Sequence, residues 1–263
     1  MSIELEGYST LRNDANLVHY MRMESATATV GSNMTNVNSV TFSAAQFNNG
    51  GVFSRASDTA LYLGSDLGIT NGAITFIGWV KFTAQPADGD LWPIFDKTDG
   101  GVFVRYGLYY TSSGGTKRLQ CRRDRAGVAD GGYTVDQTLS NDTWYQVAYT
   151  YDTTNVQGYV NGSAVGTATA ASGNGSASAV DAYVLGARAN DDGAGDGVNH
   201  SHDMTGLIDD AAVFSRALTS TEISDFYNAS SSAIKTINGL AKASVKTVDG
   251  LAIASVKTWN GLA

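Results

Sequence analysis

Cysteine, proline and charge are all scarce in this chain. Of its 263 residues, only Cys121 is cysteine and two are proline. A single cysteine excludes an internal disulfide, so no covalent cross-link supports the fold, and this weakens the case for a typical secreted eukaryotic module. Charged residues make up only 16% of the chain. Long solvated helices would need more Glu, Lys and Arg, so a helical protein is not expected.

Basic charge is also in the minority. The net charge is −8 and the isoelectric point is about 4.7, so a nucleic acid would be repelled and is not an expected partner. No apolar stretch approaches the ~20 residues that cross a bilayer, so membrane insertion is not expected. The segment Met1–Tyr8 has two acids and no basic region before an apolar run. It does not resemble a signal peptide, and we expect assembly in the cytoplasm.

Glycine and hydrophobic residues are abundant instead. The 30 glycines and the 43% hydrophobic content favour many short strands joined by tight turns around a full core. The predicted strands are Leu17–Met23, Ile74–Phe82, Leu91–Asp96, Val102–Tyr110, Lys117–Arg123, Trp144–Asp152, Val156–Val160, Ala164–Ala168, Tyr183–Ala187 and Gly206–Phe214.

The segment Ile74–Phe82 is apolar on both faces of its predicted strand. Phe76 and Phe82 fall on one face and Trp79 on the other. A strand covered on both sides belongs in the middle of a sandwich of two sheets. In Trp144–Asp152, three tyrosines and a valine alternate onto one face, as expected for a strand with one buried side.

Local signals predict one hairpin and one helix. Asn161-Gly162 lies between two predicted strands and suits a type I′ turn, in which both central residues have positive φ. Thr219 and Glu222 form a capping box that begins a short helix over Ser220–Tyr227. Ala229–Ser232 then has the composition of a linker.

The tail, residues 229–263, consists of this linker followed by an eleven-residue repeat. It occurs at Ile234–Ala241, Val245–Ala252 and Val256–Ala263. The period divides into a nine-residue strand and a two-residue Asn-Gly or Asp-Gly turn, which predicts a small β-meander with strands Leu240–Val248 and Leu251–Trp259. Three strands with one apolar face are marginal alone. We therefore expect the tail to bind copies of itself, most simply as a trimer, or a partner protein. The candidate assembly residues are Ile237, Leu240, Val248, Leu251, Trp259 and Leu262.

Several segments together resemble the laminin-G-like, concanavalin A-like jelly-roll domains of microbial and viral proteins. They are Leu17–Met23, Ile74–Lys81, Trp144–Asp152, Val156–Gly162, Val184–Arg188 and Gly206–Ile223. Their order and spacing fit over residues 12–228. The resemblance implies an all-β fold, a two-sheet antiparallel jelly-roll sandwich in residues 1–228 that is closed by the short helix. It also implies a mostly non-catalytic family that binds glycans or proteins at its rims and loops, often with a structural Ca²⁺.

The most polar loop, Asn190–Asp203, is a candidate calcium site. Clustered carboxylates separated by glycines suit an ion that takes six to eight oxygen ligands. The candidate ligands are Asp191, Asp192, Asp196, Asp203 and Asp209. A solvated turn rich in Asp, Asn and Gly is the competing and favoured interpretation. Loop 24–33 lacks the Asp-Ser-Ser-Gly-Asn-type sequence of many relatives and is not expected to supply a ligand. Asp209 and Asp210 are adjacent in a predicted strand, so only one should face the core or rim.

Basic residues gather in Lys117–Arg125, five cations in nine residues. The segment could contact an anionic glycan or an acidic partner, although a charged edge strand that resists pairing with other chains is the favoured alternative. The candidate ligand-binding residues are Arg118, Arg122, Arg123 and Arg125, together with Tyr109 if its ring is exposed for stacking on a sugar. Cys121 is interpreted as a small strand residue.

Glycoside hydrolysis is the catalytic alternative, because related glucanases share the architecture. That chemistry uses two carboxylates about 5–5.5 Å apart, and in those enzymes they are glutamates of one strand. The only glutamates here are Glu4, Glu6, Glu24 and Glu222. No two of them share a predicted strand, so an enzyme is not expected.

The leading functional hypothesis is a non-catalytic protein of a virus particle. The tail repeats resemble C-terminal extensions of phage structural proteins, which agrees with the missing signal peptide. In this hypothesis the protein is a decoration or fibre-like component at the virion surface. Its sandwich adheres to surface glycans, and its tail binds itself or capsid and tail proteins. The alternative is a purely structural module whose sandwich makes only protein contacts.

Overall fold

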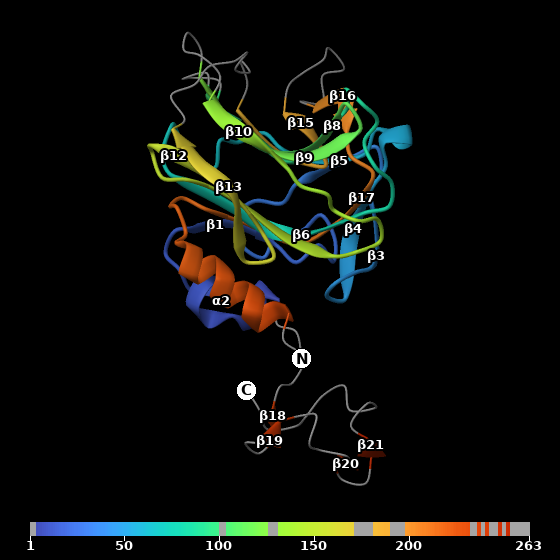
Figure 1. Cartoon of the computed structure of the whole chain (residues 1–263), viewed down its shortest axis with the longest axis vertical. Coiled ribbons are helices and arrows are strands. Elements are labelled where there is room, and N and C mark those ends of the chain that lie inside the picture. Colours follow the sequence, from blue (N-terminus) through green and yellow to red (C-terminus); the bar gives the residue numbers. More distant parts are fainter. Residues whose placement is uncertain are drawn as a thin grey trace.

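The chain folds into two antiparallel sheets packed face to face, as predicted (Figure 1). The computed structural model describes residues 4–99, 104–125, 131–170, 181–189 and 198–231, and the dipeptides 236–237, 240–241, 247–248 and 251–252. In this part of the chain, no helix is both long and apolar enough to cross a bilayer.

The sheet beside the C-terminal helix, called here the helix-side sheet, has eight strands. They are β1 (Leu17–Met21), β3 (Thr41–Ala44), β4 (Asn49–Phe53), β6 (Ile74–Phe82), β11 (Tyr145–Tyr151), β12 (Asn155–Val160), β13 (Ser163–Ala170) and β17 (Gly206–Phe214). Their order is β13-β12-β11-β6-β17-β4-β3, with β1 also paired to β17. The strand with two apolar faces, β6, is therefore central, as its sequence predicts.

The second sheet, called here the hairpin-side sheet, has seven strands in the order β10-β9-β8-β7-β14-β5-β2. They are β2 (Thr35–Val37), β5 (Ala60–Leu63), β7 (Leu91–Asp99), β8 (Val104–Ser113), β9 (Thr116–Arg125), β10 (Gly131–Asp136) and β14 (Ala182–Leu185). A separate hairpin of β15 (Ala187–Ala189) and β16 (Val198–Asp203) lies against β7.

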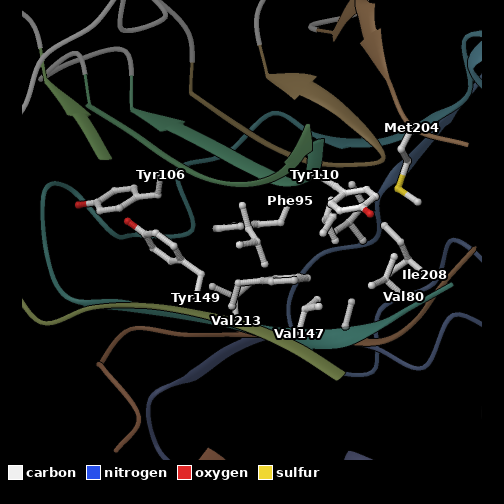
Figure 2. Packing of buried hydrophobic residues seen from close by; sticks show 14 of the residues in the cluster. Val80, Phe95, Tyr106, Tyr110, Val147, Tyr149, Met204, Ile208 and Val213 are labelled. Atoms are coloured by element: carbon white, nitrogen blue, oxygen red, sulfur yellow. The ribbon is translucent and has the colours of Figure 1, made fainter. Parts of the chain in front are cut away.

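The main core lies between the two sheets. Phe76 of β6 stacks on Phe95 of β7, with ring centroids 4.5 Å apart and nearly parallel planes. In Figure 2, Tyr106 and Tyr149 extend from opposite sheets, and their hydroxyl groups lie at the same end of the cluster. Cys121 is fully buried in this core, and burial raises the pKa of its thiol to about 12. The interpretation of Cys121 as a packed strand residue is confirmed.

A second apolar cluster covers the outer face of the helix-side sheet. It joins Ile77 of β6 to Leu5, Leu11, Ile223 and Phe226. These residues come from the short helices η1 (Leu5–Gly7) and α1 (Ser9–Arg12) and from α2 (Ser220–Ser231). Figure 1 shows α2 and the N-terminal helices together below this sheet. A further short helix, η2 (Arg55–Ser57), follows β4.

The predicted hairpin and helix start are both confirmed. Val160 pairs with Ser163, and both residues between them have positive φ, 50° at Asn161 and 76° at Gly162. The amide of Thr219 donates to Glu222 Oε2 (2.8 Å), and the amide of Glu222 donates to Thr219 Oγ1 (3.2 Å). The predicted helix end is wrong, because α2 continues to Ser231 through most of the expected linker.

The described parts of the tail form two short hairpins. Ile237 pairs with Leu240, and Val248 pairs with Leu251, so two residues separate the strands of each pair as the repeat predicts. The strands are β18 (Thr236–Ile237), β19 (Leu240–Ala241), β20 (Thr247–Val248) and β21 (Leu251–Ala252). The middles of the predicted nine-residue strands, and the candidate assembly residues Trp259 and Leu262, lie outside the described residues.

Candidate functional site

The outer face of the hairpin-side sheet carries a row of polar side chains on β9. Leu119, Cys121 and Arg123 face the core. The alternate residues Arg118, Gln120 and Arg122 therefore share the outer face, and we call these three residues the β9 strip. All three are partly exposed, with side-chain exposures of 35% for Arg118 and 22% for Arg122. Because strand residues two apart share a face, the strip extends over roughly 13 Å.

Carboxylates orient both guanidinium groups of the strip. Arg118 Nε donates to Asp136 Oδ1 of β10 at 2.9 Å. Arg122 forms a two-pronged pair with Asp124, with Nη2 2.9 Å from Oδ2 and Nε 3.2 Å from Oδ1. Asp124 is fully buried. Such forked pairs fix the plane of a guanidinium, so Arg122 is held in one orientation at the surface.

Tyr109 does not present its ring for stacking. The residue is only 1% exposed, so the condition for its proposed role is not met. A Cβ atom added to Gly107 would lie 2.2 Å from Tyr109 Oη. The tyrosine ring therefore occupies the space over Gly107, which only glycine leaves empty. Burial, followed by the charge of Asp96, raises the pKa of the Tyr109 hydroxyl.

A buried ion pair beside Tyr109 ties β15 to the sheet. Asp96 Oδ1 of β7 lies 3.4 Å from Arg105 Nε of β8, and both side chains are at most 1% exposed. Arg105 Nη2 donates to the carbonyl of Ala189 (2.7 Å), and the amide of Ala189 donates to Asp96 Oδ2 (3.0 Å). Burial raises the pKa of Asp96, and the charges of Arg105 and Arg188 oppose that rise. This pair positions the hairpin against the outer face.

Arg123 points inward and is not a surface ligand residue. Its guanidinium lies over the ring of Tyr151, 4.9 Å from the centroid, and hydrogen-bonds Asn71 Oδ1. The prediction placed all the cations of this segment in one patch, but strand alternation separates Arg123 from Arg118 and Arg122. The side chain of Arg125 lies outside the described residues. The same alternation is the signal that identifies Gln120 as a member of the outer row.

The candidate calcium ligands are only partly described. Asp191, Asp192 and Asp196 lie outside the described residues. Asp203 ends β16, where it pairs with Ala187, and is fully buried. Burial, followed by the charge of Arg188, lowers the pKa of the half-buried His202. Within the ranges that the structure describes, no three His, Cys, Asp or Glu side chains are grouped to hold a metal ion.

Asp209 and Asp210 are both buried, so the prediction that only one of them faces inward is wrong. Asp210 has a φ of 51°, and the pairing of β17 with β6 shifts after Asp209, so a bulge replaces simple alternation. Asp209 Oδ2 accepts the amide of Phe47 (2.7 Å), and Asp210 accepts the Tyr20 hydroxyl (2.6 Å) and the Leu5 amide (2.8 Å). Burial raises their pKa values to about 8 and about 7.

The four glutamates all make local contacts outside the strands. Glu4 pairs with Arg22, Glu6 with Arg12, and Glu222 with Arg216. Glu24 accepts a hydrogen bond from Asn49. No strand therefore carries the pair of glutamates found in the related glucanases.

Comparison with known proteins agrees with the sandwich fold. Domain 4 of an extracellular GH43 arabinanase from Geobacillus stearothermophilus, solved with arabinotriose, superimposes with a TM-score of 0.58 at 14% identity, covering 81% of this chain and 98% of that domain. The receptor-binding domain of botulinum neurotoxin mosaic serotype C/D superimposes with a TM-score of 0.59 at 14% identity, covering 81% of this chain and 50% of that one. The binding domain of Paraclostridial Mosquitocidal Protein 1 superimposes with a TM-score of 0.59 at 13% identity, covering 81% of this chain and 52% of that one.

The chain thus spans about half the length of these two toxin domains, and identities this low establish the fold alone. No curated protein matches the chain. A family model for the concanavalin A-like lectin/glucanase superfamily, Laminin_G_3, matches residues 55–224, which is more than half of the sequence. Together with the two-sheet sandwich, this match places the chain in the concanavalin A-like lectin/glucanase superfamily.

Proposed function

We propose that this chain is a non-catalytic carbohydrate-binding protein and that the β9 strip contacts the glycan. The observation that carries the proposal is the strip itself. Three alternate side chains of one strand share an outer face, all are partly exposed, and carboxylates orient both arginines.

The chemistry of the strip suits a sugar chain. Arg118 and Arg122 supply N–H donors, while Gln120 supplies both a donor and an acceptor. The neighbouring Asp136 and Thr134 of β10 are exposed beside them and add oxygen acceptors. Hydroxyl groups both donate and accept, so a glycan can satisfy such a mixed surface, and an acidic glycan would gain charge-assisted bonds as well. The superimposable arabinanase domain was solved with arabinotriose, which supports sugars as the ligand class.

A glycan array with purified protein tests this proposal. Arg118→Ala and Gln120→Ala should each weaken binding to the best glycan at least tenfold, because each removes hydrogen bonds to the ligand. Both positions are partly exposed, and an exposed ion pair such as Arg118–Asp136 contributes only about 0–1 kcal/mol, so the fold should survive. Arg12→Ala, which removes a partly exposed arginine near the N-terminus, should bind normally. Absence of binding to every glycan, or unchanged binding by both strip variants, would refute the proposal.

Calcium remains part of the proposal as a structural ion held by Asp191, Asp192 and Asp196 of the polar loop. The loop composition supports it. Repeating the array with EDTA tests it. We expect EDTA to abolish glycan binding and added Ca²⁺ to restore it. Glycan binding that is unchanged by EDTA would contradict a calcium ion needed for the site.

We further propose that the protein is displayed on a virus particle. Its residues 229–263 would then bind copies of themselves, or proteins of the viral capsid or viral tail. The repeat supports it, because two successive copies form hairpins of equal register. Antibody labelling of intact particles is the direct test. A purely structural module without glycan binding is the alternative. It predicts a blank array together with a multimer that depends on the tail.

A further inference from the structure

A second polar site lies on the other sheet, far in sequence from the β9 strip. Gln146 of β11, Trp79 of β6 and Asp209 of β17 are direct cross-strand neighbours, so their side chains share the outer face of the helix-side sheet. We call these three residues the Trp79 row. They are 1%, 3% and 0% exposed, respectively.

Each residue of the Trp79 row carries polar atoms that are not hydrogen-bonded. Among the residues that the structure describes, Gln146 Oε1 and Nε2, Trp79 Nε1 and Asp209 Oδ1 are buried without a partner. Native proteins hydrogen-bond nearly all buried polar groups, and each one left unmade costs about 1–3 kcal/mol. Four such atoms lie on three adjacent side chains, so one polar ligand in contact with the row can hydrogen-bond all of them.

Aromatic rings enclose the row. The Tyr227 ring of α2 stacks over Trp79 with centroids 6.0 Å apart, and the Phe47 ring meets Trp79 edge-on at 5.9 Å. Phe47 also fixes Asp209, because its amide donates to Oδ2 and leaves Oδ1 available. A Cβ atom added to Gly162 would lie 2.9 Å from Tyr227 Cβ, so close packing of α2 on this turn sets the position of Tyr227. Tyr227 is itself partly exposed and forms the outer wall.

We propose that the Trp79 row is the floor of a second ligand site, which takes one neutral, hydroxylated ring of monosaccharide size. Trp79 Nε1 and Gln146 Nε2 donate hydrogen bonds, and Gln146 Oε1 accepts them. Asp209 Oδ1 donates while its carboxyl group is protonated, because Oδ2 already accepts the Phe47 amide, and it accepts once the group is ionised. Adjacent hydroxyl groups of a sugar ring complement this mixture of donors and acceptors, whereas an inorganic ion satisfies only one kind. An apolar face of the ring packs against Trp79, in the place that the Tyr227 ring now occupies. Tyr227 covers the row in this structure, so the ligand enters as that side chain moves.

Fluorine NMR of the full chain carrying 5-fluorotryptophan tests the proposal. Free glucose, galactose, mannose, arabinose and N-acetylglucosamine are the probes. At least one should shift the Trp79 resonance, assigned from its loss in Trp79→Phe, in a saturable way. Trp92 is the matched control, because its Nε1 is also buried without a partner in the described structure but lies in the core between the sheets. Its resonance should not move.

Gln146→Leu supplies the second readout. It should weaken the response of Trp79 at least tenfold without lowering the unfolding temperature, because it removes two buried polar atoms that have no partner. Gln120→Ala should leave the response intact, which separates this site from the β9 strip. A Trp79 resonance that none of the five sugars moves, or a Gln146→Leu variant that binds like the wild type, would overturn the proposal.

Discussion

Two adjacent carboxyl groups buried in β17 show how a single backbone angle changes the face of a sheet to which a side chain points. Alternation along a strand predicts that Asp209 and Asp210 point to opposite sides. The left-handed conformation at Asp210 turns both side chains to the same covered face. Asp visits this conformation more readily than most residues, but the sequence does not mark this particular Asp among so many. The buried acid pair could therefore not be predicted, although the strand that carries it was.

The raised pKa of Asp209 gives a testable pH dependence. The native state holds this proton up to about pH 8, whereas an unfolded Asp releases it near pH 4. The free energy of unfolding should therefore fall as the pH rises between these values. In Asp209→Asn, whose side chain is always neutral, the fall from pH 5 to pH 9 should be smaller by on the order of 4 kcal/mol.

Urea denaturation at several pH values measures that difference. Asp136→Asn is the control, because Asp136 is 73% exposed and its substitution should leave the pH profile parallel to that of the wild type. The depressed pKa of buried His19 also makes stability fall at acid pH, but it acts equally in all three proteins. A profile of Asp209→Asn that parallels the wild type would contradict the assignment.

At the scale of elements, strongly patterned segments were predictable and weakly patterned ones were not. The central strand β6, the hairpin at Asn161-Gly162 and the start of α2 follow from apolar periodicity, turn chemistry and the capping box. The short strands β2 and β3 escaped prediction because they are three and four residues long and mostly exposed. Asn38 and Ser39, between β2 and β3, and Asn48, between β3 and β4, all have positive φ angles. The turns around these strands therefore consist of polar residues whose sequence resembles that of a loop.

The capping box at the start of α2 should contribute measurably to the stability of the protein. Thr219→Ala removes the hydroxyl that accepts the amide of Glu222, so it should destabilise the protein by about 1 kcal/mol. Thr221→Ala is the matched control in the first turn, where the side chain is exposed, and should change stability by less than about 0.5 kcal/mol. Chemical denaturation of both variants measures the difference. Equal stabilities would show that the cap contributes nothing to the folded state.

At the scale of the whole molecule, the candidate site depends on which face of a sheet each residue occupies. The sequence could identify a cluster of cations at 117–125, but separating Arg118 and Arg122 from Arg123 required the register of β9 between β8 and β10. The Trp79 row is less predictable still. Its three residues are separated by 67 and 63 positions and meet only because β6 lies between β11 and β17.

Removal of the tail tests the proposed assembly. The helix α2 ends at Ser231, so a chain truncated after Ser231 keeps every described element of the sandwich. Light scattering should give a multiple of the 27.6 kDa chain mass for the full-length protein and a single copy for the truncated one. The unfolding temperature of the truncated protein should remain close to that of the full chain. An oligomeric state that does not depend on the tail would show that assembly uses another surface.

The burial of Cys121 has a practical consequence for such measurements. The only thiol of the chain lies in the core, and its pKa is raised to about 12, so it is neither accessible nor ionised near neutral pH. A cysteine introduced at an exposed position would therefore react alone with maleimide dyes or spin labels, without any change to the native residue. The protein is thus already suited to site-specific labelling, by which the proposed assembly and motions of Tyr227 can be followed in solution.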